Sequence, residues 1–200
     1  MKKIILISLW VIIPIFLFAQ NNDTVSNKII ITDKGDYMEM KLGDSVFTIS
    51  CDAMYAEYLV KGVEKANNED YSGAISDFNL ALLYKTSDPQ VFYNRGLAYY
   101  YLKEYEKAID NYNEATRLDS LYEEVYSQRG IAKSLAGDFA GAEEDFIKAI
   151  HLKPDKGVNH YNYGISLLMN NQNDMACAEF KRAENLGYTE AGNFLIQYCH

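Results

Sequence analysis

The chain has 200 residues, of which 48% are hydrophobic and 24% charged, a composition typical of a soluble protein with a sizeable buried core. Its formal net charge is −9 at pH 7. An acidic surface of this size repels phosphate groups, so we expect neither a nucleic-acid partner nor general binding to an anionic membrane surface.

The first residues have the features of a secretory signal peptide. Lys2 and Lys3 form a short positive region, residues 4–18 are almost wholly apolar, and Ala19 offers a small residue for cleavage. We therefore predict a signal peptide over residues 1–19 and an exported protein, either periplasmic or secreted. An uncleaved membrane anchor is the other interpretation, and membrane attachment is expected only in that case. The apolar run is short for a span of about 20 residues, which favours cleavage.

Residues 20–52 are predicted to form an extended or β-hairpin segment. Three runs of strand-forming residues, 28–32, 37–42 and 45–49, are separated by turn residues. Two or three strands are marginally stable in water without further packing. The segment therefore docks on the helical region, pairs with a partner or stays extended, and the sequence does not choose among these.

From residue 53 onward the apolar residues follow helical spacing, and four columns of residues recur every 34 positions without insertion. A fixed period of this length is typical of stacked units that bury their apolar faces only against one another. We place the recurring glycine where two helices of a pair cross, and the recurring aromatic residue between successive pairs. The columns are Gly62, Gly96, Gly130 and Gly164; Ala74, Ala108, Ala142 and Ala176; Phe78, Tyr112, Phe146 and Phe180; and Ala81, Ala115, Ala149 and Ala183.

The helical region is expected to cover residues 53–200 as four helix pairs and a last helix. Pro89 suits the first turn of a helix, where its missing N–H costs nothing. Asn, Asp and Gly residues fall in the short turns inside the pairs. The predicted helices are 53–67 and 71–84, 89–102 and 105–117, 123–136 and 139–151, 157–170 and 173–185, and finally 189–199.

These columns resemble the tetratricopeptide repeat, whose 34-residue pattern has Gly and Tyr in the first helix, A-x3-F in the second and a closing Pro. The copy at 89–122 matches best, through Phe92, Gly96, Tyr99, Ala108, Tyr112 and Ala115. The other copies are about 55–88, 123–156 and 157–190, followed by a capping helix at 189–199. The first copy is the weakest, because Lys65 stands where Tyr is usual.

The resemblance implies an all-α, right-handed superhelix whose first helices line a concave groove for a peptide segment or a partner protein. For each apolar groove residue, packing between helix pairs is the other interpretation. The groove residues implied by the family pattern are Tyr93, Asn94, Leu97, Tyr100, Tyr101, Gln128, Ile131, Tyr161, Asn162 and Ile165.

One feature of some members of this family is missing. Members that hold acidic chaperone tails use a cluster of Lys, Arg and Asn residues on the first helices. The equivalent positions here carry Leu59, Val63, Glu124 and Gln128, and Asn94 alone is retained. We therefore expect an aromatic and apolar groove that suits a hydrophobic partner segment better than an anionic one.

The three cysteines allow one bridge within the helical region. We predict a disulfide between Cys177 and Cys199 that clamps the last helix onto the array, while two buried thiols are the other interpretation. Cys51 is left over by this pairing and is a candidate for pairing between molecules.

Motifs for catalysis are missing from the sequence. It contains no Gly-rich phosphate loop, no H-E-x-x-H zinc motif and no serine nucleophile elbow, and its three histidines are spread along the chain. We predict no catalytic residue, no metal site and no cofactor. The predicted function is a non-catalytic interaction module, an adaptor or scaffold in the cell envelope or exterior. The alternative is a structural subunit that self-associates through the N-terminal segment or Cys51.

Overall fold

A computed structural model describes residues 29–42 and 44–199. Contacts within the chain divide it into two compact units, with the division between Ala53 and Met54. The predicted fold, a helical repeat array preceded by a short β segment, is confirmed. The predicted signal peptide at 1–19 lies outside the described residues.

The first unit contains a three-stranded antiparallel sheet with the order β1-β2-β3. Its strands are β1 (Ile29–Asp33), β2 (Tyr37–Leu42) and β3 (Ser45–Ser50), each within one residue of its predicted bounds. Gly35 forms the turn before β2 at a φ of +88°, a conformation that glycine adopts without strain. Met38 and Met40 are buried, whereas Phe47, which pairs with Met40, is 45% exposed.

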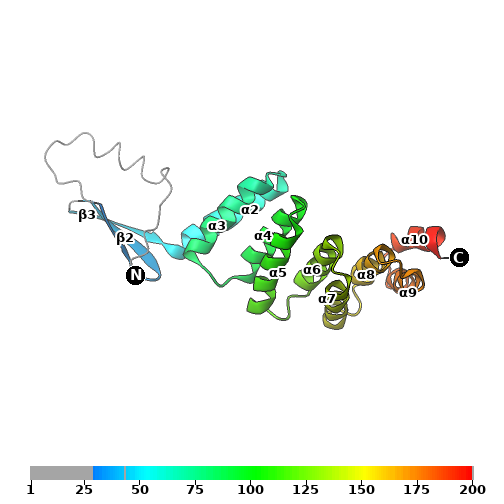
Figure 1. Cartoon of the computed structure of the whole chain (residues 1–200). Helices are drawn as coiled ribbons and strands as arrows, with labels where there is room; N and C mark the ends of the chain where they lie inside the picture. The colour runs from blue at the N-terminus through cyan, green and yellow to red at the C-terminus, as the bar shows by residue number, and fades with distance from the viewer. Residues whose placement is uncertain (1–28, 43, 200) are drawn as a thin grey trace. The chain divides into compact units, whose positions relative to one another are not determined.

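The second unit is a row of helices in consecutive pairs (Figure 1). Helix α2 begins two residues earlier than predicted, and α10 is shorter than predicted at both ends. The helices are α2 (Cys51–Asn67), α3 (Tyr71–Tyr84), α4 (Pro89–Tyr101), α5 (Tyr105–Leu118), α6 (Glu123–Ala136), α7 (Phe139–Leu152), α8 (Gly157–Met169), α9 (Asn173–Asn185) and α10 (Ala191–Tyr198).

The aromatic column fills space inside each helix pair, which corrects its predicted place between pairs. A Cβ atom at Gly96 would lie 2.6 Å from the ring of Tyr112, and one at Gly164 would lie 2.6 Å from the ring of Phe180. The ring from the second helix therefore lies against the bare backbone of the first helix of the same pair. Glycine is needed at this crossing because any side chain would overlap the ring.

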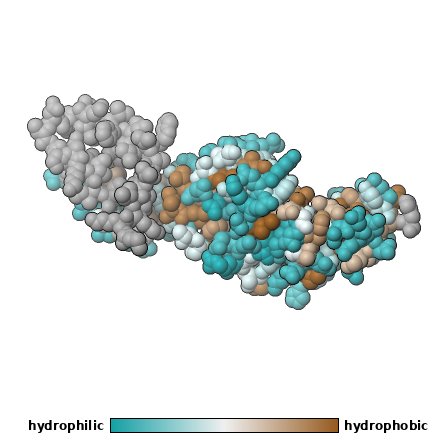
Figure 2. Space-filling model, in the orientation of Figure 1, coloured by the Kyte–Doolittle hydropathy of each residue, from teal (hydrophilic) through white to brown (hydrophobic). Residues whose placement is uncertain are grey.

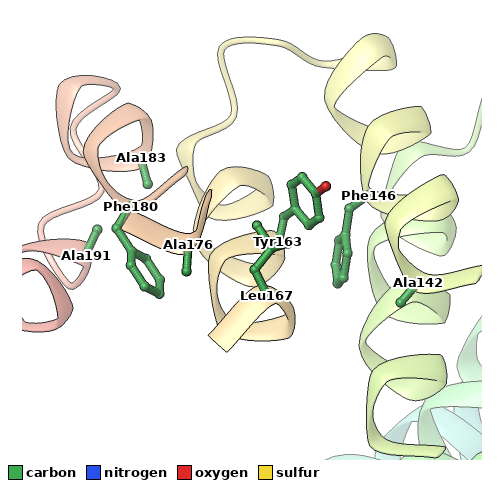
Figure 3. Close-up of a cluster of buried hydrophobic side chains, with 8 residues drawn as sticks. All are labelled: Ala142, Phe146, Tyr163, Leu167, Ala176, Phe180, Ala183 and Ala191. Carbon is green, nitrogen blue, oxygen red and sulfur yellow. The ribbon is translucent and has the colours of Figure 1, made fainter. Parts of the chain in front are cut away.

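The aromatic rings also reach the next pair. Phe146 stacks on Tyr163 with ring centroids 5.7 Å apart, and both belong to the core that Figure 3 shows between α7, α8 and α9. Every alanine of the two alanine columns and every ring of the aromatic column is fully buried. The face of the helical unit that Figure 2 shows is mostly hydrophilic, with apolar patches between the hydrophilic areas.

The turns inside the pairs share one backbone conformation. Glu69, Lys103, Gly137 and Asn171 lie 34 residues apart, and all have positive φ angles between 59° and 87°. Asp70 and Asp138 follow two of these residues and accept hydrogen bonds from the N–H groups of Gly73 and Gly141, which caps α3 and α7. The period therefore fixes the turn geometry as well as the packing.

Two arginines one period apart connect neighbouring pairs. Arg95 on α4 donates to Asn111 of its own pair and to Asn79 of the preceding pair, each at 2.6 Å. Arg129 on α6 repeats this arrangement with Asp145 at 2.6 and 2.8 Å and with Asn113 at 2.9 Å. These bonds fix how one pair sits on the next, because the guanidinium group has a rigid set of donors.

Helix α10 continues the repeat in phase. Ala191, Phe194 and Tyr198 lie 34 residues after Gly157, His160 and Gly164 of α8. Ala191 is fully buried, as expected for the first residue of a first helix, whereas Tyr198 occupies the glycine column. The predicted capping helix is therefore built like the first helix of a further repeat.

Candidate partner-binding groove

A pocket lies between the first two repeats, on the side where residues of α2 and α4 face each other. Its volume is about 320 Å³, at the small end of the range for ligand pockets. Three of the predicted groove residues, Asn94, Leu97 and Tyr101, meet here. The complete lining is Val63, Ala66, Asn67, Glu69, Tyr71, Phe78, Asn94, Leu97, Ala98 and Tyr101.

Two tyrosines form an aromatic wall of this pocket. The rings of Tyr71 and Tyr101 are stacked, with centroids 5.0 Å apart and planes 11° from parallel. Tyr101 is 57% exposed, although its neighbour Tyr100 packs an edge against it at 5.4 Å. An exposed ring held by its neighbours offers rigid contact area at a small entropic cost, as aromatic residues do in protein interfaces.

The pocket also contains amide groups and a single charge. Asn67 and Asn94 lie on its wall, and a side-chain amide can donate to and accept from the backbone of an extended peptide. Glu69 is the charged residue of the lining. The arrangement can therefore hold an apolar side chain while bonding the backbone beside it, and its charge disfavours an anionic group.

Tyr93 and Tyr100 are placed mostly against other tyrosines. The ring of Tyr93 lies 6.2 Å from Tyr112 and 5.2 Å from Tyr122, and burial raises the pKa of Tyr93 to about 12. Tyr100 lies 6.0 Å from Tyr105 and packs against the same core. Both residues support the wall of the groove more than they offer free surface to a partner.

The predicted residues of the third and fourth repeats do not join this pocket. Ile131 and Ile165 pack against the C-terminal core, and Gln128 is half-buried on α6. Asn162 donates to Ser127 at 3.4 Å. Tyr161 lies 5.5 Å from Phe194 of α10, so the last helix covers it.

Some pocket residues were missed by the sequence reasoning. Tyr71 begins the second helix of the first pair, and Glu69 lies in the turn before it. A search restricted to first helices therefore passes over both. The signal in the sequence is the period: Glu69 stands at the turn position that Gly137 occupies two periods later, and the structure gives both residues a positive φ.

Cys177 and Cys199 are bonded in the structure, with 22 residues of sequence separation. Within residues 29–42 and 44–199, no group of three His, Cys, Asp or Glu residues is arranged to hold a metal ion. In the same ranges, no helix has the length and apolar character needed to cross a membrane.

The sequence and fold are similar to known proteins. The tetratricopeptide repeat family model matches residues 89–120. A small glutamine-rich tetratricopeptide repeat-containing protein of Dictyostelium discoideum is 30% identical over 134 residues, which cover 67% of this chain and 38% of that protein. The heat-shock protein cognate co-chaperone sgt12 of Aspergillus fumigatus is 30% identical over 97 residues, covering 48% of this chain and 28% of that protein. The chain thus spans about a third of the length of these relatives.

Solved structures show the same fold. The crystal structure of MamA has a TM-score of 0.63 and 22% identity, covering 69% of this chain and 81% of that one. The first tetratricopeptide repeat domain of Spaghetti (RPAP3), bound to the HSP90 peptide SRMEEVD, has a TM-score of 0.56 and 23% identity, covering 57% of this chain and 90% of that one.

The relatives correct the predicted location. Small glutamine-rich tetratricopeptide repeat proteins are cytosolic co-chaperones, which points away from export, so the prediction of a periplasmic or secreted protein is wrong. The physical reason is that an apolar run of about fifteen residues is also typical of a buried helix, so hydropathy does not by itself identify an export signal. The helical unit of this chain therefore has the fold of a tetratricopeptide repeat array, and its residues 89–120 match the model of that family.

Proposed function

We propose that this protein is a non-catalytic interaction module that binds an extended segment of a partner protein in the pocket between α2 and α4. The observation that carries the proposal is the stacked pair Tyr71 and Tyr101, which presents an exposed aromatic wall beside the amides of Asn67 and Asn94. Similarity to a repeat domain bound to an HSP90 peptide supports a peptide as the class of partner.

The partner segment that fits this pocket is apolar or aromatic and carries no acidic tail. Glu69 on the pocket wall and the net charge of −9 both repel carboxylates. The positions that would supply cations to an acidic peptide carry Leu59, Val63 and Glu124 instead. The peptide SRMEEVD is therefore expected to bind weakly here, although it binds to the RPAP3 repeat domain.

A peptide array tests the proposal. Random heptapeptides are probed with the labelled full chain, and SRMEEVD is included as the acidic reference. Binders are expected to be enriched in aromatic and aliphatic residues, and Tyr101→Ala is expected to weaken them at least about tenfold, since aromatic anchors dominate interface energies. Leu121→Ala is the matched control, because Leu121 is 72% exposed and lies outside the pocket. Equal binding by both variants, or a preference for acidic peptides, would contradict the proposal.

Self-association through the N-terminal sheet is a second candidate. β1 and β3 are the two edges of the sheet among the described strands, and Val46 and Phe47 on β3 are each about half exposed. Exposed edges of this kind pair readily with other strands. Light scattering with and without reductant, on wild type and on Cys51→Ser, tests this candidate, and a monomer under every condition removes it.

A further inference from the structure

The C-terminal helix α10 packs mainly against one neighbouring helix, α9. Ala191 is its fully buried residue, and Phe194 contacts the rings of Tyr161 and Phe180 at 5.5 and 5.0 Å. Elsewhere on the helix, Ile196 is 77% exposed and Tyr198 is 46% exposed. The helix therefore buries one apolar side, made of Ala191, Phe194 and Leu195, and leaves the rest of its surface exposed.

The intrinsic stability of α10 is low. It has eight residues, fewer than the 12–15 or so that an isolated helix needs in water. The connection before it contains Gly187 at a φ of +86°, a position where glycine leaves the backbone free to change direction. The disulfide between Cys177 on α9 and Cys199, just past α10, therefore has a large share in holding the helix in place.

We propose that α10 is a thiol-controlled cap, and that its release uncovers a second docking surface at the C-terminal end of the array. This surface is separate from the pocket between α2 and α4 and does not depend on the function proposed for that pocket. Cys177 and Cys199 are half-buried rather than enclosed, so a small dithiol can reach the bridge.

The chemical step is thiol–disulfide exchange. A thiolate of the dithiol attacks one sulfur of the bridge, the other cysteine leaves as a thiolate, and the second thiol of the reagent then displaces the first cysteine. Two electrons and two protons pass from the dithiol to the protein. The products are the thiols of Cys177 and Cys199 and the oxidised reagent. Air or another disulfide reverses the reaction.

The uncovered surface consists of the rings of Tyr161 on α8 and Phe180 on α9. Phe180 is fully buried with α10 in place, and the ring of Phe194 on α10 lies 5.0 Å from Phe180 and 5.5 Å from Tyr161. The occupant that this surface fits is an amphipathic helix with the spacing of α10, a small residue followed three and four positions later by Phe and Leu. Ala191, Phe194 and Leu195 supply that pattern in the intact chain.

Hydrogen exchange tests the release of the cap. We compare the oxidised full chain, the same chain in dithiothreitol, and the variant Cys177→Ser/Cys199→Ser, with Cys51→Ser as the matched control that keeps the bridge. Opening the bridge is expected to speed exchange in residues 191–199 roughly 100-fold, the factor expected for losing this loop closure. Exchange in α5 is expected to stay unchanged. Unchanged exchange in α10 with the bridge open, or equal acceleration throughout α8 and α9, would overturn the proposal.

A peptide tests the docking surface itself. The probe is a fluorescein-labelled peptide of residues 189–198, which contains no cysteine, measured by anisotropy. It is expected to bind the double serine variant at least about tenfold more tightly than the oxidised wild type. The same peptide with Phe194→Ala is expected to lose this binding. Equal binding to both proteins, or no binding to either, would rule out the surface.

Discussion

The buried hydroxyl groups of Ser134 on α6 and Ser166 on α8 lie 2.7 Å apart and connect the first helices of two successive repeats. Ser134 donates its own proton to the carbonyl oxygen of Gly130 at 2.9 Å. Ser166 therefore supplies the proton of the bond between the two hydroxyls. The groove side of the array is thus fixed by a directed polar contact as well as by apolar packing.

Ser134→Ala is expected to lower the free energy of unfolding by about 1 kcal/mol, because it leaves the Ser166 hydroxyl buried without its acceptor. The double variant Ser134→Ala/Ser166→Ala is expected to be no less stable than the single one, since both polar groups are then gone. Urea unfolding of the full double-mutant cycle measures this coupling. If the free-energy cost of the double variant equals the sum of the costs of the two single variants, the two hydroxyls do not interact.

Gly96→Ala is expected to lower the free energy of unfolding by about 1–3 kcal/mol, because the new Cβ would lie 2.6 Å from the Tyr112 ring. Gly192→Ala is the matched control. It adds the same atom to a helix, but the nearest contact there is 3.5 Å away, to Glu184. If urea unfolding curves showed both variants to be less stable than the wild type, or both to be more stable, the packing described for the glycine column would be contradicted.

Tyr112→Phe is expected to raise stability by about 1 kcal/mol. The Tyr112 hydroxyl is buried and has no hydrogen-bond partner within the described part of the chain, and burial raises the pKa of this tyrosine. Removing such a group recovers part of its desolvation cost. Phe78, Phe146 and Phe180 occupy the same column, so the ring fits. Thermal unfolding measures the shift, and a lower melting temperature would mean that the hydroxyl does have a partner.

The carboxyl group of Asp88 makes the stability of the array depend on pH in the acid range. Burial alone raises the pKa of the Asp88 carboxyl, but bonds from the Tyr55 hydroxyl at 2.6 Å and the Gln90 N–H at 2.8 Å outweigh it and hold the pKa below its usual value. Because the folded pKa is lowered, the stabilisation is complete above the unfolded pKa of about 3.9 and is lost as the pH falls through the folded pKa.

Asp88→Asn is therefore expected to flatten the fall in stability below about pH 4, while it costs less than about 1 kcal/mol at pH 7, since amide and carboxylate cap a helix almost equally well. Urea midpoints from pH 7 to pH 3 measure this. An unchanged pH slope in Asp88→Asn would remove Asp88 as the titrating group.

Glu123 and Glu124 are neighbours with different expected roles. Glu123 is 1% exposed and bonds Lys156 at 2.7 Å and Asn159 at 2.6 Å, so Glu123→Ala is expected to cost about 3 kcal/mol. The Glu124 side chain is 40% exposed, so Glu124→Ala is expected to cost less than about 1 kcal/mol. Chemical denaturation of the two variants side by side checks this, and equal costs would contradict it.

The period predicts most of the fold because the residues that repeat are the ones that pack. Gly96 and Tyr112 could be recognised from spacing alone, since their types are restricted by a single helix crossing. Arg95 could not, because its partners Asn79 and Asn111 lie 16 residues away on each side, in two different pairs. Spacing along the chain does not reveal which polar groups the stacking brings together.

The groove was predicted less completely than the fold. Asn94, Leu97 and Tyr101 follow from the family pattern, but Tyr71 enters the pocket from a second helix, and the sequence gives no reason to expect its stack with Tyr101. Tyr161 has the same position in its repeat as Tyr93, yet α10 covers it. Whether a given position faces a partner or the chain itself depends on what packs next to it.

The tyrosine at position 198 restricts how a further repeat could be added after α10. In each of the four repeats the second helix places an aromatic ring, a phenylalanine in three repeats and a tyrosine in one, where the first helix has only a glycine hydrogen. Tyr198 stands at the equivalent position of α10, so its side chain would meet the ring of a following second helix. Duplication of a repeat unit, the usual way that solenoid genes lengthen, would therefore yield a well-packed product at this end only after a codon change from tyrosine to glycine.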